Sequence, residues 1–421
     1  MRPRNEVFVR QSVLYVLMAT VVACLCGCGG VAGPTHPPTG TAIQVIFSGP
    51  APLVAAEQIG TGTWAAATLQ SGELSFTLPQ GTTTYAIAYV CPTVQGQGPL
   101  NYEYVIEATI QDGTTYAVSC LPVPTAGTVT GSVNATAIAG TANVQIYGQF
   151  GYGASVTGAS GSFSATIASG SNDIAVVAQD ASSNVLGLKI VRSQTVPGAV
   201  NGGNVVTLAS TDAVTTMQPI SVTHIPTGFN ATPSVGMYYD TANETAFKLL
   251  SSSSATQYPG VPASEAQNGD FYSFSASTAN ASNQSVYIRQ LSTTAAPIAL
   301  QFPAPLTYTA PTPAAFPSFA FSYTGFSGLS AVADYAEMDW STSATTQSIL
   351  TVTATAGYQN GATNLIVPNL TSISGFFPSA SSGTTVNWQD IVYGGTYMPY
   401  TVLPTTGTLS SALNSGSYIE P

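Results

Sequence analysis

Apolar and polar residues alternate in short runs along most of the chain beyond residue 40. In residues 74–78, for example, two leucines and a phenylalanine alternate with Ser75 and Thr77. A period of two is typical of an antiparallel strand with one buried and one solvated face. Clusters of Gly, Asn and Ser separate the runs and predict turns. Helical periodicity is nearly absent after residue 30, so we predict an all-β fold.

An internal repeat indicates how the strands are grouped. Residues 71–81 align with residues 160–170 at an offset of 89, with two serines, two glycines and a threonine matched. A spacing of about 90 residues is the size of a small β-sandwich. We therefore predict three or four tandem antiparallel sandwiches after a cleaved signal helix. The expected ranges are a tether at 29–40, sandwiches at 41–124, 125–212, 218–302 and 318–421, and a proline-rich connector at 303–317. The pattern leaves open whether the last two sandwiches form one domain.

The second of these ranges carries a family resemblance. Its glycines at 127, 131, 161 and 170, with the strand at 174–178, resemble those of carboxypeptidase-regulatory-like (transthyretin-like) domains of bacterial surface proteins. The resemblance covers about residues 125–210 and, through the repeat, residues 41–124. It implies a seven-stranded Ig-like or transthyretin-like sandwich without catalytic residues of its own. Residues 147–153 depart from the compact form, and we predict a long loop there.

The N-terminus predicts export. An apolar run at residues 12–26 follows three arginines, as in a secretory signal, and is shorter than the ~20 residues of a spanning helix. Its exit at residues 25–28 resembles a bacterial lipobox, which implies cleavage before Cys28 and a lipid on its thiol. Residues 21–24 fit the same pattern, so Cys24 is the alternative. We expect a lipid-anchored extracytoplasmic protein at the outer membrane or cell surface, with the membrane as its partner.

Charged residues make up 6% of the sequence, against about 25% in an average protein. After removal of the signal, Lys189, Arg192, Lys248 and Arg289 face 17 acidic residues, a net charge of −13. Four scattered cations cannot neutralise a phosphate backbone, which excludes nucleic acid as a partner. So few cations also leave little self-repulsion once carboxylates are protonated, so we expect the fold to tolerate acid.

Cysteine usage agrees with export. Three of the five cysteines lie in the signal region, and the other two are Cys91 and Cys120. Two cysteines in an oxidising compartment predict a disulfide.

Candidate catalytic and metal-binding residues are sparse. His224 is the only histidine in the predicted sandwiches, and the sequence has no Gly-x-Ser-x-Gly elbow. We interpret His224 as structural, because one histidine cannot build a typical zinc site or a triad alone. No cofactor is expected.

The densest acidic stretch is residues 334–340. Strand parity places Glu337 and Asp339 on one face with Tyr335, and the alternate residues in the core. A solvated strand face explains the two carboxylates. Calcium bound by Glu337 and Asp339 is the alternative, because carboxylate oxygens suit this ion.

Aromatic residues gather near the C-terminus: Trp388, Tyr393, Tyr397 and Tyr400. Exposed rings could stack on sugars, whereas buried ones would belong to the core. The sequence thus supports three hypotheses. The first is a non-catalytic, lipid-anchored structural or adhesive surface protein that contacts a protein or glycan. The second is a carbohydrate-binding surface protein that uses these aromatics, and the third and weakest is an exported hydrolase.

Overall fold

The computed structural model describes residues 40–48, 50–92, 100–120, 126–149, 151–243, 245–252, 256–309, 320–324, 330–343, 346–397 and 404–421. The predicted signal segment, Cys24, Cys28 and Tyr400 lie outside these residues. The described chain is almost entirely β-structure, which confirms the predicted all-β class. No helix among the described residues has the length and apolar character needed to cross a membrane.

The first seven strands form a sandwich. A three-stranded sheet, β4–β1–β7, faces the four strands β3–β2–β5–β6. Ile43, Leu74 and Ile87 meet in the core between them. The strands are β1 (Gly40–Ser48), β2 (Val54–Ile59), β3 (Ala65–Ala67), β4 (Glu73–Pro79), β5 (Thr84–Cys91), β6 (Leu100–Thr109) and β7 (Thr115–Ser119).

The second sandwich repeats this strand order. Its sheets are β11–β8–β14, with β15 also paired to β8, and β10–β9–β12–β13. The strands β9 and β10 form a hairpin across residues 147–153, so the prediction of a long loop there is wrong. The strands are β8 (Ala126–Asn134), β9 (Asn143–Gly148), β10 (Gly151–Thr157), β11 (Ser160–Ala168), β12 (Gly170–Gln179), β13 (Val185–Val196), β14 (Gly198–Ala199) and β15 (Val206–Thr207).

The third sandwich has the same order again, with sheets β19–β16–β22 and β18–β17–β20–β21. In all three sandwiches the first strand pairs antiparallel with the fourth and parallel with the seventh. The strands are β16 (Met217–Thr223), β17 (Ser234–Asp240), β18 (Ala246–Ser252), β19 (Gln257–Pro259), β20 (Phe271–Ala279), β21 (Gln284–Ser292) and β22 (Ile298–Gln301).

The fourth sandwich varies the plan. Its four-stranded part is β26–β25–β28–β29, and β23–β24–β27 covers it. The strand β23 precedes β24, pairs antiparallel with it and lies within the range predicted as a connector. Residues 306–310 of that range contain no proline, so they can still pair. The elements are β23 (Thr307–Thr309), β24 (Ala320–Thr324), β25 (Ala331–Ser341), β26 (Gln347–Thr355), α1 (Ala356–Gln359), β27 (Asn364–Ile366), β28 (Thr385–Gly395) and β29 (Gly407–Ile419).

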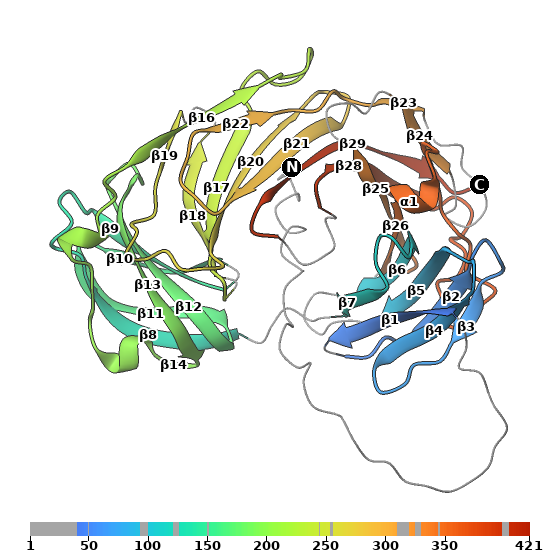
Figure 1. The fold of residues 1–421 in the computed structure, drawn as a ribbon, viewed down its shortest axis with the longest axis horizontal. Helices are drawn as coiled ribbons and strands as arrows, with labels where there is room; N and C mark the ends of the chain where they lie inside the picture. Colours follow the sequence, from blue (N-terminus) through green and yellow to red (C-terminus); the bar gives the residue numbers. More distant parts are fainter. Residues whose placement is uncertain are drawn as a thin grey trace, which may run out of the picture.

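Three of the four sandwiches share one sheet. Twelve strands run in the order β18–β17–β20–β21–β29–β28–β25–β26–β6–β5–β2–β3 and arch across the molecule (Figure 1). The third and fourth sandwiches join where β21 pairs antiparallel with β29, and the fourth and first join where β26 pairs parallel with β6. Three of the four ranges predicted as tandem sandwiches are therefore connected by strand pairing. Within residues 218–421, which the sequence left open as one or two domains, two sandwiches share this sheet.

The second sandwich is attached by its sheet face instead. Nearly every residue of β12 is buried, because the sheet is covered on both sides. Val176 packs in the core of its own sandwich, whereas Val177 belongs to the cluster of the third sandwich around Phe247. Figure 1 shows this sandwich below one end of the arch.

The hairpins between the fifth and sixth strands show that the second and third sandwiches share detail beyond topology. Asp180 accepts hydrogen bonds from the backbone N–H groups of residues 182 and 184, and Asn280 does the same for residues 282 and 284. In each hairpin the third residue after this Asp or Asn, Ser183 or Asn283, has a positive φ. The same turn chemistry thus recurs in two sandwiches.

Candidate functional site

Four carboxyl groups lie on one buried face of the twelve-stranded sheet. Glu103 and Glu107 come from β6, Asp334 from β25 and Asp390 from β28, and their exposed fractions are 0%, 9%, 0% and 0%. The same face presents an apolar cluster that includes Ala88, Met338, Trp340 and Val352. We call the four carboxyls the acidic core face. The ion pairs among the described residues all involve Lys189 or Arg192, so none belongs to this face.

Asp334 and Asp390 form a pair within this face. Ala336 is opposite Asp390 and Val392 is opposite Asp334, so the two carboxyls are diagonal neighbours on adjacent strands. Gln359 Nε2 donates to Asp334 Oδ2 at 3.1 Å. The other three carboxyl oxygens have no well-aligned donor among the described residues while both groups are ionised. A proton on Asp390 would make this group a donor to Asp334, which favours a neutral Asp390 beside an ionised Asp334.

The pKa values follow from this arrangement. Burial raises the pKa of Asp334 to about 6. Burial and then the neighbouring charge of Asp334 raise the pKa of Asp390 well above its usual range. Because two like charges in a low-dielectric core repel, the pair holds a proton at neutral pH.

Two tyrosines of the covering sheet face the pair. The Tyr308 hydroxyl lies near Asp390 without a well-aligned hydrogen bond, and the ring of Tyr308 stacks on Trp388 with 5.6 Å between centroids. Burial and the two nearby carboxyls raise the pKa values of Tyr308 and Tyr323 above the usual range. Both hydroxyls therefore stay protonated and can act only as neutral partners.

Glu103 and Glu107 lie where the first and fourth sandwiches meet. Glu103 Oε2 accepts the backbone N–H of Phe377 at 2.9 Å, while Oε1 has no partner among the described residues. Burial raises the pKa of Glu103 to about 7, against the lowering effect of the Phe377 N–H. Burial raises the pKa of Glu107 to about 8. In turn, burial and then the charge of Glu107 raise the pKa of Tyr358, in α1, to about 12.

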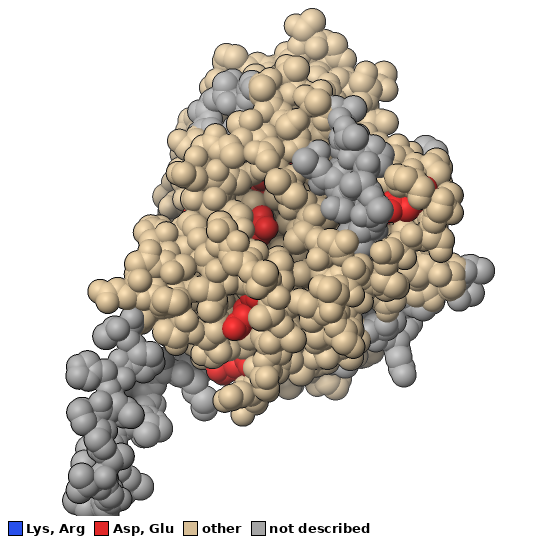
Figure 2. Space-filling model, turned by 90° about the vertical axis from the view of Figure 1, so that its right-hand side faces the viewer, with Lys and Arg blue, Asp and Glu red and all other residues tan. Residues whose placement is uncertain are grey.

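A pair of carboxyls that shares a proton can perform acid–base chemistry only if a substrate reaches it. Asp334 and Asp390 are both 0% exposed and lie beneath Tyr308. The acidic core face therefore holds protonated carboxyl groups inside the fold. Figure 2 shows the side of the molecule nearest the first and fourth sandwiches, where the described surface displays no Lys or Arg and only a few Asp or Glu.

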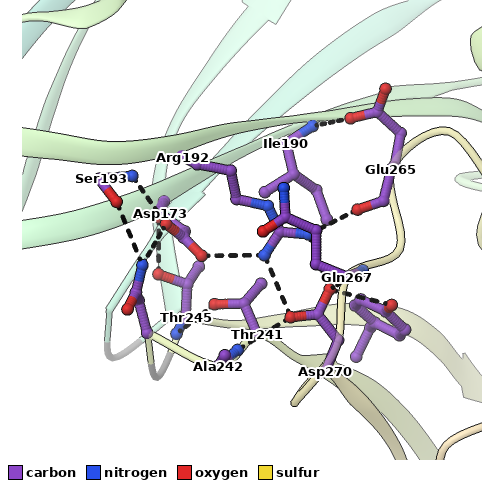
Figure 3. A network of polar contacts seen from close by, with 12 residues as sticks. Asp173, Ile190, Arg192, Ser193, Thr241, Ala242, Thr245, Glu265, Gln267 and Asp270 are labelled. Atoms are coloured by element: carbon purple, nitrogen blue, oxygen red, sulfur yellow. Dashed lines mark hydrogen bonds and ion pairs between the residues drawn. The ribbon is translucent and has the colours of Figure 1, made fainter.

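A second polar cluster joins the second and third sandwiches (Figure 3). Arg192 of β13 donates from Nη1 to Asp173 Oδ2 at 3.0 Å and from Nη2 to Asp270 Oδ2 at 2.7 Å. Lys189 lies 3.4 Å from both Asp212 and Glu265. We call these six residues the Arg192 network.

The network also covers the open edge of β13. Glu265 Oε2 accepts the backbone N–H of Ile190 at 2.7 Å, so a carboxylate takes the place of a neighbouring strand. Although burial raises the pKa of Asp173, donors from Asn243, Ser193 N–H and Arg192 outweigh it and lower the pKa below the usual value. In contrast to the acidic core face, this carboxyl is held as an anion.

The predicted disulfide is confirmed. Cys91 at the end of β5 is bonded to Cys120, just after β7, with 5.1 Å between Cα atoms. It links the two sheets of the first sandwich. His224 is exposed, has a φ of 60°, and its Nδ1 lies 3.1 Å from Thr223 Oγ1.

The predicted acidic stretch differs in part from expectation. Ala336, Met338 and Trp340 are in the core, as strand parity predicts, but Tyr335 on the other face is buried and donates to Glu337 at 2.8 Å. Asp339 accepts hydrogen bonds from two side-chain amides, at 2.6 and 2.9 Å. The Asp339 oxygen that could bind calcium therefore already accepts two N–H donors. Among the described residues no group of three His, Cys, Asp or Glu could hold a metal ion.

The C-terminal aromatics do not share a surface in the described structure. Trp388 lies between Tyr308 and Phe321 in the core of the fourth sandwich. Tyr397 is 8% exposed in a separate cluster, against which Tyr393 packs. These three residues therefore do not form one stacking platform, because the partly buried Trp388 packs against one cluster and Tyr393 and Tyr397 belong to another.

Sequence reasoning missed the acidic core face, although parity could have found part of it. Asp334 has the same parity as Ala336 and Met338, and Asp390 that of Val386 and Val392. The rule that placed Glu337 outside therefore places Asp334 inside. That the two carboxyls meet requires the pairing of β25 with β28, which one strand alone does not reveal.

No protein-family model matches the chain, and no curated protein sequence matches it. Several solved chains resemble it weakly, two of which are as follows. One is the tip fimbrial protein Mfa3 from Porphyromonas gingivalis, with C-terminal truncation, at 10% identity over 36% of this chain and 78% of that one, with a TM-score of 0.16. The other is the FN1–FN3 domains of chicken CNTN1, at 9% identity over 91% and 96%, with a TM-score of 0.17.

Proposed function

We propose that this chain is a non-catalytic structural or adhesive protein of the cell surface, in which the sandwiches act as one stiff unit. The observation that carries the proposal is the twelve-stranded sheet that joins three sandwiches. Tandem domains linked only by flexible segments move independently, whereas a hydrogen-bonded ladder does not allow this without breaking bonds.

Both junctions in this sheet are long. Strand β21 pairs with β29 from Gln284 opposite Asn414 to Leu291 opposite Gly407. Strand β26 pairs with β6 along its length, from Gln347 opposite Leu100 to Ala354 opposite Glu107. A junction of this kind resists shear, because its backbone hydrogen bonds must break together. That property suits a protein that transmits force or holds a binding surface away from a membrane.

The perturbed titratable groups support a role without catalysis. The carboxyls with the largest upward pKa shifts are those of the acidic core face, which are buried. Catalytic groups with perturbed pKa values lie in clefts that substrates enter. Here the shifted groups lie inside a protein core, which supports an effect on stability rather than on catalysis.

Single-molecule pulling on residues 40–421 from both ends at pH 5 tests the proposal. We expect the first, third and fourth sandwiches to unfold together in one step. The second sandwich should unfold in a separate step, which serves as the internal reference for the unfolding of a single sandwich. Three successive steps of equal length from the sandwiches that share the sheet would contradict a single stiff unit.

The anchor is a separate part of the proposal. We propose that Cys28, or alternatively Cys24, carries a lipid and that residues 29–40 are the tether. Intact-mass spectrometry after expression in a lipoprotein-processing bacterium tests this, with Cys28→Ala and Cys24→Ala as the matched pair. One variant should lose the acyl mass and leave the membrane fraction. If both keep it, neither cysteine is the anchor.

A further inference from the structure

The junction between the first and fourth sandwiches contains two buried acids on one strand. Glu103 and Glu107 both project from β6 toward the fourth sandwich, and the parallel pairing of β6 with β26 forms the junction. We call the β6–β26 pair and the contacts across it the seam. Unlike the junction of β21 with β29, the seam joins residues about 250 positions apart in the chain.

Glu103 is enclosed by the fourth sandwich. Its neighbours across the sheet are Val90 on β5 and Leu350 on β26, and Phe377 covers it from the segment after β27. None of these three is titratable. The partnerless Oε1 is therefore an acceptor in an apolar site, which a proton would neutralise.

Glu107 lies in a similar position. Ala86 and Ala354 flank it on β5 and β26, and Tyr358 of α1 faces it. The next charged group along the same row is Asp334, opposite Ala354. Each titratable neighbour is thus either a neutral tyrosine or another acid.

A third acidic residue at the seam accepts hydrogen bonds from both sides of it. Asp112, in the turn after β6, accepts hydrogen bonds from Thr109 N–H and from Thr355 Oγ1 of β26, at 2.9 and 2.6 Å. These donors come from both sides of the seam, so Asp112 links β26 to the turn after β6. Glu103 and Glu107 have no comparable set of donors among the described residues.

We propose that the seam is a pH-operated latch: it is closed while Glu103 and Glu107 carry protons, and it opens when they ionise, so that residues 40–120 separate from the fourth sandwich. Opening admits water to both carboxylates. The disulfide and the core of the first sandwich lie on the opposite face of β5 and remain intact.

The direction of the effect follows from linkage. The pKa of Glu103 is about 7 and that of Glu107 about 8 in the closed seam, and both return toward their usual values when water reaches them. A group with a raised pKa in the closed state favours closure at low pH and loses that effect as pH rises through the raised value. Between pH 5 and pH 9 we expect the open population to increase on the order of 10³-fold or more.

Hydrogen exchange of the mature chain tests the latch. Protection factors, corrected for the intrinsic pH dependence of exchange, are measured for amides of β6 and β26 from pH 5 to pH 9. Amides of β12 and β13 serve as a reference in the same molecule. We expect protection at β6 and β26 to fall with pH while the reference changes little.

Two variants separate the latch from a general loss of stability. Glu103→Gln with Glu107→Gln keeps the shape of both side chains and cannot ionise, so the fall in protection should disappear. Glu57→Gln on β2 is the matched control, because burial also raises the pKa of Glu57, which lies away from the seam. It should keep the wild-type response. A fall that persists in the double variant, or protection that stays constant with pH in the wild type, would overturn the proposal.

Discussion

Asp334 and Asp390 lie diagonally across the adjacent strands β25 and β28, both fully buried, and three of their four carboxyl oxygens have no hydrogen-bond partner among the described residues. The pair thus makes part of the core's stability conditional on protonation. An ion pair at the same place would behave in the opposite way, because it would lose stability in acid.

Replacing Asp390 with Asn should stabilise the protein at pH 8. The amide is neutral at every pH and its N–H can donate to Asp334, so the pair no longer needs a proton. We expect a gain of about 1–3 kcal/mol in the free energy of unfolding at pH 8 and little change at pH 4, where Asp390 is already neutral. Urea unfolding at the two pH values measures the difference.

Asp339→Asn is the matched control for this change. Asp339 lies on the same strand as Asp334 but is partly exposed and already receives two amide donors. It should give no gain at pH 8. Equal effects of the two variants would show that removal of negative charge, rather than relief of the buried pair, stabilises the protein.

The whole chain should be more stable in mild acid than in mild alkali. The folded-state pKa values of Asp334, Glu103 and Glu107 are about 6, 7 and 8, all above the values of about 4 in an unfolded chain. Their contribution is complete below pH 4 and is lost as pH rises through 6, 7 and 8. The lowered pKa of Asp173 acts in the opposite sense, and its contribution is lost as pH falls below 4.

Denaturant unfolding at pH 5, 7 and 9 checks this prediction. We expect the free energy of unfolding to decrease by at least about 3 kcal/mol from pH 5 to pH 9. The expectation from composition, that the fold tolerates acid, thereby gains a structural basis. A stability that rises between pH 5 and pH 9 would contradict it.

The fold class was predictable because period-two alternation is a local property of a strand. The disulfide was predictable because Cys91 and Cys120 are the two cysteines beyond the signal region. The joining of sandwiches was not, because pairing between β26 and β6 depends on which edges meet, and alternation on one strand says nothing of its neighbours. One sign was nevertheless present: residues 85–91 are almost continuously apolar, which is typical of a strand covered on both faces.

The candidate site divides in the same manner. Parity alone places Asp334 with the buried residues of β25. A cluster of acidic residues in the sequence nevertheless suggests that all of them face the solvent. Glu103 and Glu107 have the parity of Val105, which is 1% exposed. Their burial depends on the fourth sandwich, about 250 residues away, so no local pattern could have identified them as members of one face.

Removal of the disulfide should destabilise the first sandwich. Cys91 and Cys120 are 29 residues apart, and a loop of this length corresponds to about 3–4 kcal/mol in the chain-entropy account. The Cys91→Ser, Cys120→Ser double variant should lower the free energy of unfolding by this amount. Dithiothreitol should lower the free energy of unfolding of the wild type by the same amount and leave that of the variant unchanged. A further decrease in the variant would point to another target of the reductant.

Arg192→Ala should separate the second sandwich from the third. The change leaves Asp173 and Asp270 as buried anions, 0% and 3% exposed, without their shared cation. Breaking such a pair from one side costs about 3–5 kcal/mol. Because Arg192 helps to lower the pKa of Asp173, its removal lets Asp173 take up a proton more readily. The loss should therefore be smaller at pH 4 than at pH 7, the reverse of the trend expected for the acidic core face. Urea unfolding at both pH values measures it, with Lys248→Ala, a partly exposed lysine outside the network, as the control. An Arg192→Ala loss that is independent of pH would indicate that the guanidinium acts through packing alone.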